Sequence, residues 1–288
     1  MPELPEVTVI VNSLNRKIKG LTFRYVIYDW PKRFEWGKLT ENDLKGAKVT
    51  GVERRGKVIL INTSGKFTIL IHLKLTGQLV YLDKKTRVAG GHPIPPLNSP
   101  VPNKTTRATF EFTNDAHLYF NDMRKFGWVR FVETDDEKIA EAIGNTLGPD
   151  ALEVSFEEFR ERLLKKPKSR IKKLLMDQTF VSGIGNIYSD EGLWRAKIHP
   201  LRAVGSLKDG EIKALHKGIR DSLKLAIDKG GSSANSFVDS GGEKGLFLTF
   251  AKAYHMTGRP CARCKTPIER KKTDGRSAHF CPKCQKLF

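Results

Sequence analysis

All four cysteines of the 288-residue chain lie within its last 28 residues, and their spacing narrowly limits what this part of the chain can form. The pattern is C-x2-C-x16-C-x2-C, made by Cys261, Cys264, Cys281 and Cys284. Each C-x2-C pair places two thiolates on one tight turn, and two such turns complete a tetrahedral Zn2+ site. Because four protein ligands leave no open coordination position, we expect one zinc ion with a structural role. Disulfides are the alternative.

The sequence predicts neither a secretory signal nor a membrane span. Its purely apolar runs, such as Val58–Ile61, fall far short of the roughly 18 residues that a membrane-spanning helix needs. Glu3 and Glu6 stand where a signal peptide has a basic start and an apolar stretch. We therefore expect a soluble, cytoplasmic protein, whose reducing compartment favours zinc over disulfides.

The positive charge of the chain is unevenly distributed. The 51 Lys and Arg residues exceed the 32 Asp and Glu residues by 19. Residues 1–130 carry 22 basic and 11 acidic side chains, residues 131–243 carry 18 and 19, and residues 244–288 carry 11 and 2. Two basic blocks flanking a neutral middle indicate a nucleic acid held by two surfaces. A merely solubilising excess of charge is the alternative.

The residue pattern of the first half predicts one helix followed by many short strands. Apolar positions in Val7–Lys19, before Gly20, predict the helix. Runs rich in β-branched and aromatic residues then predict an antiparallel sandwich or barrel. These runs are Lys57–Asn62, Phe67–Leu73, Gln78–Leu82, Ala108–Phe112, His117–Phe120 and Gly127–Val132. Asp83–Thr106 holds five of the 14 prolines and is expected to be a long surface loop.

From about residue 134 the pattern becomes helical. Ser155-Phe156-Glu157-Glu158 is typical of a capping box opening a helix to about Lys165. Further helices are expected over about 170–178, 186–195 and 208–229, and Ser232–Gly245 is expected to be a flexible loop. A length of 288 residues suits about two domains.

The N-terminal residues could carry chemistry. Removal of Met1 would expose the secondary amine of Pro2, and an α-amine has a reference pKa near 7.7–8.0. Such an amine attacks an aldehyde-level carbon to give an iminium, and the adjacent Glu3 could act as a general acid. A proline after a start codon with no catalytic role is the alternative.

A glycine-rich turn precedes one of the predicted helices. Gly183 and Gly185 permit a tight turn, after which Asn186 begins a helix whose free N–H groups suit a phosphate. Ordinary helix capping is the alternative. The turn follows a basic segment with Lys168 and Lys172, which makes a phosphate partner more plausible than capping alone.

Several ordered motifs across the whole chain resemble those of bacterial formamidopyrimidine-DNA glycosylases. They are Pro2–Val7, Arg54–Lys57, Asp122–Gly127, Gly183–Asp190, Ile198–Pro200, Gly230–Ser233, and the cysteine segment with Gly275-Arg276. Leu4 separates the chain from the related endonuclease VIII branch, which typically has glycine there.

The resemblance implies an α+β fold of two domains that clamp damaged double-stranded DNA. An N-terminal β-sandwich catalytic domain with an N-terminal helix is expected over residues 1–133. A helical helix-two-turn-helix domain with a lesion-capping loop follows over 134–245, and a β-hairpin zinc finger over 246–288. The implied activity is that of a DNA glycosylase and AP lyase of base excision repair. It would excise 8-oxoguanine and formamidopyrimidines and cleave the strand by β,δ-elimination. A monomer is expected.

The resemblance also implies catalytic roles. Pro2 matches the nucleophile that attacks C1′ of the flipped nucleotide, and Glu3 matches the general acid. Lys57 matches a lysine that contacts phosphate and acts in β-elimination. Arg276 matches the finger arginine assigned to δ-elimination.

Further positions match DNA contacts of the family. Asn186, His72, Lys168 and Lys172 match groups that bind the phosphate backbone. Arg124, Phe126 and Leu75 match the residues that enter the gap left by the flipped base. For the lysines the alternative is a solvated basic helix face, and for Phe126 an ordinary buried strand position.

Three departures from the family pattern bear on lesion preference. Leu75 stands where methionine is usual, and Lys104-Thr105-Thr106-Arg107 replaces a Lys-His-Asp-His stretch, so that Thr105 lacks a histidine assigned to DNA contact. The proline-rich segment before it is longer than usual.

Two other functions stay open: an endonuclease VIII-like glycosylase for oxidised pyrimidines, and a non-catalytic zinc-finger DNA-binding protein.

Overall fold

The structure is a computed structural model that describes residues 1–92, 94–144, 147–231, 237–238 and 246–287. By its internal contacts the chain divides into two compact units. The first comprises Met1–Asn145 with Lys229–Leu246, and the second comprises Thr146–Asp228 with Phe247–Phe288. This grouping by contacts does not test the expected three-part division, which stays a prediction. Among the described residues, no helix is both long and apolar enough to cross a membrane.

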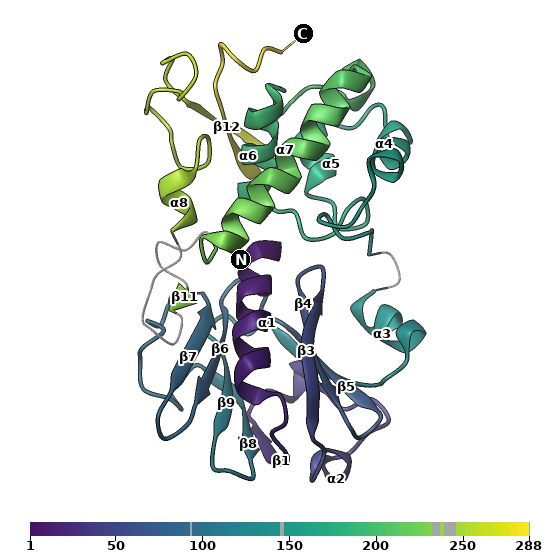
Figure 1. Cartoon of the computed structure of the whole chain (residues 1–288), viewed down its shortest axis with the longest axis vertical. Coiled ribbons are helices and arrows are strands. Elements are labelled where there is room, and N and C mark those ends of the chain that lie inside the picture. Colours follow the sequence, from purple (N-terminus) through teal and green to yellow (C-terminus); the bar gives the residue numbers. More distant parts are fainter. Residues whose placement is uncertain (93, 145–146, 232–236, 239–245, 288) are drawn as a thin grey trace. The chain divides into compact units, whose positions relative to one another are not determined.

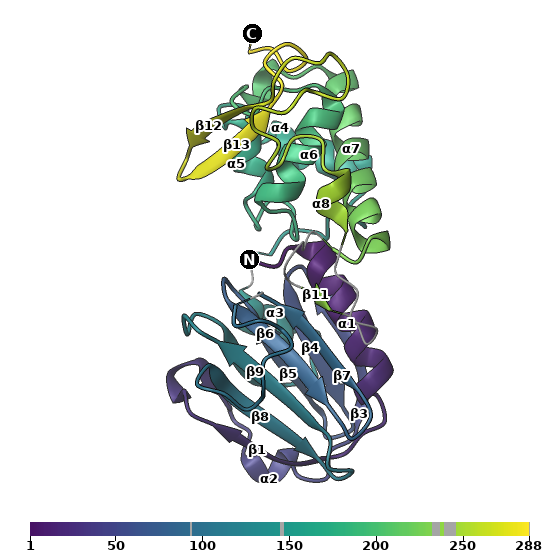
Figure 2. The ribbon, with the colours of Figure 1, turned by 90° about the vertical axis from the view of Figure 1, so that its left-hand side faces the viewer.

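The first unit is a sandwich of two sheets, as the sequence predicts. The larger sheet has the order β1-β8-β9-β6-β7-β11 (Figure 2). Its strands are β1 (Phe23–Tyr28), β8 (Thr106–Phe112), β9 (His117–Asp122), β6 (Gly77–Leu82), β7 (Arg87–Gly91) and β11 (Phe237–Val238). The smaller sheet has the order β2-β10-β5-β4-β3. Its strands are β2 (Phe34–Glu35), β10 (Trp128–Glu133), β5 (Phe67–His72), β4 (Val58–Thr63) and β3 (Val49–Arg55). All neighbours pair antiparallel except β2 and β10.

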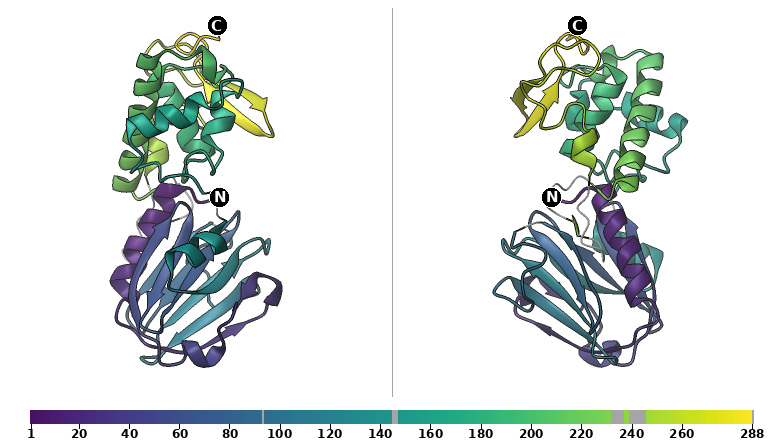
Figure 3. Two further views of the ribbon diagram at one scale, coloured as in Figure 1. Left: turned by 90° about the vertical axis from the view of Figure 1, so that its right-hand side faces the viewer. Right: turned by 60° about the vertical axis from the view of Figure 1, so that its left-hand side comes forward.

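Helices close the sandwich at one edge and cover one outer face. Helix α1 (Leu4–Ile18) lies against β3 and β7 and adds Val7, Ile10 and Leu14 to the core between the sheets (Figure 1). Helix α3 (Asp136–Ile143) lies across the outer face of the smaller sheet and packs on Trp128 (left view of Figure 3). Two short helical segments, α2 (Glu41–Leu44) and Pro31–Arg33, connect strands.

The expectation of a long loop over Asp83–Thr106 is wrong in part, because the segment contains strand β7. The chain after β7 is also anchored: Arg87 donates to the carbonyls of Leu97 and Ser99, and Leu97 is buried. Gln78 donates in the same way to the carbonyls of His92 and Pro95. Side chains on neighbouring strands thus satisfy backbone groups that prolines and glycines leave without a ladder partner.

The second unit combines helices with a two-stranded hairpin. The helices are α4 (Phe156–Leu164), α5 (Ile171–Leu175), α6 (Asn186–Ala196), α7 (Asp209–Asp228) and α8 (Phe247–Phe250), with a 3-10 turn at Val204–Ser206. The hairpin strands are β12 (Glu269–Thr273) and β13 (Arg276–Phe280). The β-sandwich, helical part and finger hairpin match the predicted fold class.

Two local predictions for the second unit need correction. Of the expected capping box, Ser155 accepts a bond from the Glu158 N–H, but the Glu158 carboxylate bonds Arg162 instead of closing the box. The helix expected to reach residue 178 ends at Leu175, since Asp177 and Gln178 bond to turn residues. The flexible loop predicted over 232–245 lies outside the described residues except for 237–238, which form β11.

Candidate active site

The N-terminal residues of α1 place Pro2 and Glu3 at one end of the sandwich unit. Glu3 is the N-cap residue of α1, and Glu6 accepts a hydrogen bond from the Glu3 N–H at 2.9 Å in a capping box. Glu3 and Glu6 are only 4% and 7% exposed. Gly231 lies against the Glu6 side chain, so the end of the described 229–231 segment adjoins this helix start. The helix N-terminus thereby fixes the backbone from which Pro2 extends.

The turn between β3 and β4 presents Lys57 beside the same helix. Arg54 donates to the Thr8 hydroxyl at 2.7 Å and to the Gly56 carbonyl at 3.3 Å, which ties this turn to α1. Lys57 is only 6% exposed. The turn that carries Lys57 is therefore fastened to Thr8 in the helix that Glu3 caps.

His72, at the end of β5, is held as a neutral ring. Burial, together with the nearby ammonium groups of Lys74 and Lys57, lowers its pKa from the usual range to about 3. Its Nδ1 accepts the Lys74 N–H at 2.9 Å, so the ring proton lies on Nε2. His72 can therefore donate one hydrogen bond without carrying a charge.

The low pKa of His72 makes the folded chain less stable in acid. An unfolded-state histidine binds a proton near pH 6.5, whereas His72 in the folded chain does not until about pH 3. Stability therefore falls as the pH drops below 6.5, by about 2 kcal/mol between pH 7 and pH 5. The free energy of unfolding, measured in urea, should fall less for His72→Gln than for the wild type between pH 7 and pH 5. The difference between the two losses should be about 2 kcal/mol. Equal losses in the two proteins would contradict the buried neutral ring.

A buried carboxylate joins the two loops that carry the predicted gap-filling residues. Asp122 is 1% exposed, bonds the Thr76 hydroxyl, and accepts the N–H groups of Arg124 at 3.2 Å and Gly127 at 2.6 Å. Thr76 also accepts the Arg124 N–H at 3.1 Å. Asp122 thus fixes the 123–127 loop to the turn before β6. In that turn Gly77 is required, because a Cβ there would lie 2.4 Å from the Leu73 carbonyl oxygen.

These loops present Arg124, Phe126 and Leu75 from neighbouring positions. The Arg124 guanidinium stacks 4.9 Å from the centre of the Phe126 ring, and Phe126 is 43% exposed. Phe126 lies outside the strands and is not part of the hydrophobic core. The alternative of an ordinary buried strand position for Phe126 is therefore wrong.

The departure from the family pattern at residues 104–107 has a structural explanation. Thr105 is buried and bonds Asn103 through its N–H and its hydroxyl. Arg107 donates to the Asp122 carbonyl and to Asp29, so it supports the same loop that Asp122 organises. This segment therefore supports the 123–127 loop through Arg107, while the Thr105 side chain bonds within the segment itself.

In the second unit, Asn186 begins α6 after the predicted glycine turn. Gln178 shapes the turn by accepting the Gly183 N–H at 3.0 Å and donating to the Ile184 carbonyl at 2.8 Å. The Asn186 carboxamide oxygen is buried and has no hydrogen-bond partner among the described residues. Buried polar atoms are almost always paired, so this amide is prepared for a ligand or a water.

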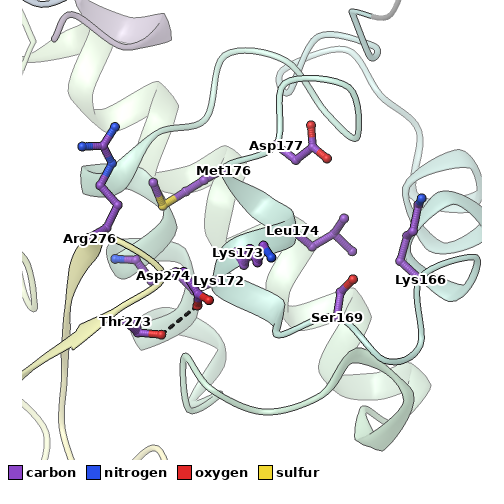
Figure 4. A pocket seen from close by; sticks show the side chains of 10 residues that line it. All are labelled: Lys166, Ser169, Lys172, Lys173, Leu174, Met176, Asp177, Thr273, Asp274 and Arg276. Atoms are coloured by element: carbon purple, nitrogen blue, oxygen red, sulfur yellow. Dashed lines mark hydrogen bonds between the residues drawn. The ribbon is translucent and has the colours of Figure 1, made fainter.

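Arg276 follows the tip of the hairpin. Asp274 and Gly275 both have positive φ, of 49° and 75°, as a two-residue type I′ turn requires. Arg276 is exposed and lines a cavity of about 350 Å³ with Lys166, Ser169, Lys173 and Asp177, as Figure 4 shows. The arginine therefore stands beside further cations at an accessible surface.

The two predicted lysine contacts differ in their surroundings. Lys168 is exposed in the turn before α5 rather than on a helix. Lys172 is 2% exposed and forms an ion pair with Asp190. Lys172 also lines the cavity beside Arg276, so its direct contact with DNA stays a prediction.

The four cysteines converge as a zinc site requires. They are free thiols, and their sulfur atoms all lie within 4.8 Å of one another. The Cys264 sulfur is 3.4 Å from those of Cys281 and Cys284. Sulfur atoms about 2.3 Å from a tetrahedral zinc lie about 3.8 Å apart, so the cluster fits one zinc ion with no further ligand.

Several supporting residues were missed in the sequence. Asp122 and Thr76 clasp two loops, Gln178 shapes the turn before α6, and Glu191 accepts the N–H groups of Lys252, Ala253 and Tyr254. Burial raises the pKa of Glu191, and these N–H groups oppose that rise. For Glu191 a signal was available, because two adjacent acidic residues stand on a helix that is otherwise buried.

Comparison with known proteins covers nearly the whole chain. The formamidopyrimidine-DNA glycosylase N-terminal domain model matches residues 1–129, and the H2TH domain model of the same glycosylase matches 147–238. A zinc finger found in FPG and IleRS matches 258–287. The formamidopyrimidine-DNA glycosylase of Pelotomaculum thermopropionicum is 39% identical over 290 residues, covering 100% of both chains. That of Heliobacterium modesticaldum is 38% identical, covering 99% of this chain and 100% of the relative.

Solved structures agree with the sequence relatives. A Lactococcus lactis FPG mutant in complex with DNA containing Fapy-dG superposes with a TM-score of 0.86 at 32% identity. MutM in complex with DNA containing carbocyclic 8-oxo-G gives 0.84 at 32% identity. Each comparison covers 99% of this chain and 100% of the other.

Fold, cysteine cluster and full-length relatives together define a DNA glycosylase with a zinc finger. The chain belongs to the formamidopyrimidine-DNA glycosylase family, the bifunctional DNA glycosylases and AP lyases that act on 8-oxoguanine and formamidopyrimidine lesions. The family resemblance, the enzyme class and the structural zinc predicted from the sequence are thereby confirmed.

Proposed function

We propose that this chain excises 8-oxoguanine and formamidopyrimidines from double-stranded DNA through the amine of Pro2 and then cleaves the strand by β,δ-elimination. One observation carries the proposal most directly. The Arg54–Thr8 hydrogen bond holds the Lys57 turn against the helix whose first turn presents Pro2 and Glu3. A nucleophile, an acid and a second amine are thereby gathered on one unit.

The first step forms a bond between the Pro2 nitrogen and C1′ while the glycosidic bond breaks and the base departs. Met1 must be removed beforehand, since the Pro2 nitrogen is otherwise an amide without nucleophilic character. Glu3, held at the buried helix start, protonates the ring oxygen as the sugar opens. The product is an iminium between Pro2 and the opened sugar.

The following steps expel the two phosphates from that iminium. Lys57 acts on phosphate and in β-elimination, which breaks the bond from C3′ to its oxygen. Arg276 supports δ-elimination, which breaks the bond from C5′ to its oxygen. His72 donates from Nε2 as a neutral ring. Asn186, at the start of α6, and Lys168, through an exposed ammonium, bind the same backbone.

Lesion access requires the nucleotide to leave the stack. We propose that Arg124, Phe126 and Leu75 fill the gap, because Asp122 and Thr76 hold their two loops together and the Phe126 ring is exposed. The chain is proposed to work as a monomer on chromosomal DNA in the cytoplasm, where free thiols are retained for zinc.

The function is tested by incubating the purified chain with labelled duplexes. We expect a duplex with 8-oxoguanine opposite cytosine to be cleaved faster than a duplex with thymine glycol. The cleaved strand should carry the 3′-phosphate end that δ-elimination leaves. Preference for the pyrimidine lesion would instead indicate the endonuclease VIII-like function. Tight binding without cleavage would indicate the non-catalytic zinc-finger protein.

Arg124 should set the preference for the opposite base. Its guanidinium can donate to the acceptors of cytosine, and a well-placed pair of such bonds gives about 1–3 kcal/mol of discrimination. Arg124→Ala should therefore reduce the ratio of activity opposite cytosine to that opposite adenine by roughly tenfold or more.

The matched control is Lys125→Ala, which removes one charge from the same loop. The Lys125 ammonium lies 4.2 Å from the centre of the Trp30 ring, turned to a different partner from Arg124. Its loss should leave the opposite-base ratio near that of the wild type. A ratio that Arg124→Ala leaves unchanged would exclude this role for Arg124.

A further inference from the structure

A buried ionic cluster fastens the strand that begins with Arg276 to helix α6. Asp190 on α6 is fully buried, and His279 on β13 is 5% exposed. One Asp190 oxygen pairs with the Lys172 ammonium at 2.5 Å. The other accepts the His279 N–H at 3.0 Å and lies 2.9 Å from His279 Nδ1. The carboxylate therefore joins α5, α6 and β13.

Lys172 makes a second bond that reaches closer to Arg276. Its ammonium donates to the carbonyl of Ser277, the residue after Arg276, at 2.9 Å. The Asp190 and Lys172 bonds thus reach Ser277 and His279, two alternate positions of β13. The strand that carries Arg276 is held at two points by this pair.

A separate contact fixes the tip of the hairpin. The Asp274 carboxylate accepts the Thr273 hydroxyl at 2.7 Å and pairs with Arg170 at 3.5 Å, immediately before α5 (Figure 4). Arg276 therefore leaves the hairpin between two anchored points, the Asp274 turn and the Ser277 carbonyl. The partners of these two points are Arg170, immediately before α5, and Lys172 on α5.

We propose that Lys172 and Asp190 are positioning residues for Arg276 and that Lys172 acts through the hairpin rather than on DNA. This inference rests on the proposed role of Arg276 in δ-elimination. A displacement of about 1 Å in a reacting group can cost on the order of a hundredfold in rate, so the strand that carries the guanidinium must be held. Two of the three N–H donors of the Lys172 ammonium are already directed at Asp190 and at the Ser277 carbonyl, which ties this side chain to the hairpin.

The experiment measures the ratio of δ- to β-elimination products on a pre-formed abasic site. Lys172→Met and Asp190→Asn should each lower this ratio by about ten- to a hundredfold. Borohydride trapping, which reports the Pro2 step, should change far less than the ratio. Lys213→Met, which removes an exposed lysine of α7, is the matched control and should behave as the wild type.

Arg276→Ala separates positioning from direct contact. In that background, adding Lys172→Met should cause no further fall in the product ratio or in the salt dependence of DNA binding. If Lys172 itself binds a phosphate, the slope of log K against log salt will become less steep by a further amount of about 0.9. Such a change, or additive losses in the ratio, would overturn the proposal.

Two further results keep the outcomes distinct. The double variant Lys172→Met/Asp190→Asn leaves no buried charge unpaired, so it should keep its zinc and still show the low ratio. A wild-type ratio in this folded double variant would show that the pair is not needed for positioning. If Arg276→Ala alone leaves the ratio unchanged, the fault lies with the proposed role of Arg276 instead.

Discussion

A chain that carries an uncleaved tag ahead of Pro2 will form no borohydride-reducible adduct with 8-oxoguanine duplex or with a pre-formed abasic site. The same chain with its tag removed so that Pro2 is the first residue will trap on both. The expected difference is essentially complete, because acylation converts the nucleophilic amine into an amide. Peptide mapping should place the adduct on the N-terminal peptide that begins with Pro2.

The fraction of amine that is unprotonated at neutral pH distinguishes Pro2 from Lys57, the other amine on the same unit. An ammonium group of ordinary lysine pKa, near 10.4, is almost wholly protonated at about pH 7, whereas a free α-amine is partly unprotonated. The secondary amine of proline also gives an iminium without losing a further proton. Pro2 is therefore the better nucleophile, although Lys57 is held nearby by the Arg54–Thr8 bond.

Lys57→Ala supplies the matching control for this prediction. It should still trap on a pre-formed abasic site, because the Schiff base does not need its amine, while its β-elimination slows. An adduct that maps to Lys57 would contradict the assignment. Equal trapping by the tagged and the free chain would contradict it as well.

Disruption of the zinc site should strongly weaken DNA binding without removing the chemistry of the first unit. Cys261→Ser leaves three ligands, and a structural zinc site contributes folding free energy outright. The finger hairpin would then lose the metal that stabilises its fold, and Arg276 would no longer be held in place. We expect DNA affinity to fall by about a hundredfold, and its dependence on salt to become less steep because fewer phosphates are neutralised.

Metal analysis and trapping complete this test. The native chain should contain one zinc per molecule, and Cys261→Ser much less. At saturating protein, the variant should still trap a pre-formed abasic site through Pro2. A native protein without stoichiometric zinc, or a variant with unchanged DNA affinity, would contradict the structural role of the metal.

The packing around the cysteines explains why the effect should extend beyond the metal itself. Trp194 of α6 packs with Cys261 and Cys281, and Arg263 stacks 3.8 Å from the centre of its ring while bonding the Trp194 carbonyl. Glu191 accepts the backbone N–H groups of residues 252–254. The finger and α6 therefore support each other, and a change in one is felt by the other.

Features that depend on local spacing were predictable from the sequence. The two C-x2-C pairs predict the cysteine cluster because each pair forms one turn. Alternation and helical periodicity predict the strands of the sandwich and most helices of the second unit. The family resemblance added the enzyme class, which the comparisons confirm. The roles of Pro2, Glu3, Lys57 and Arg276 stay predictions.

Features that depend on a distant partner were decided only by the tertiary structure. In the sequence Lys172 is one more cation in a basic segment, yet its partners Asp190 and Ser277 are 18 and 105 residues away. The strand within Asp83–Thr106 forms by pairing with β6, and the segment after it is held by side-chain bonds from Arg87 and Gln78 that no local pattern predicts. Burying a polar group is favourable only when a partner meets it, and that partner is chosen by packing rather than by neighbouring residues. The sequence by itself thus determined most of the elements and the metal site, whereas packing decided which charged side chains are exposed and which are buried in ion pairs.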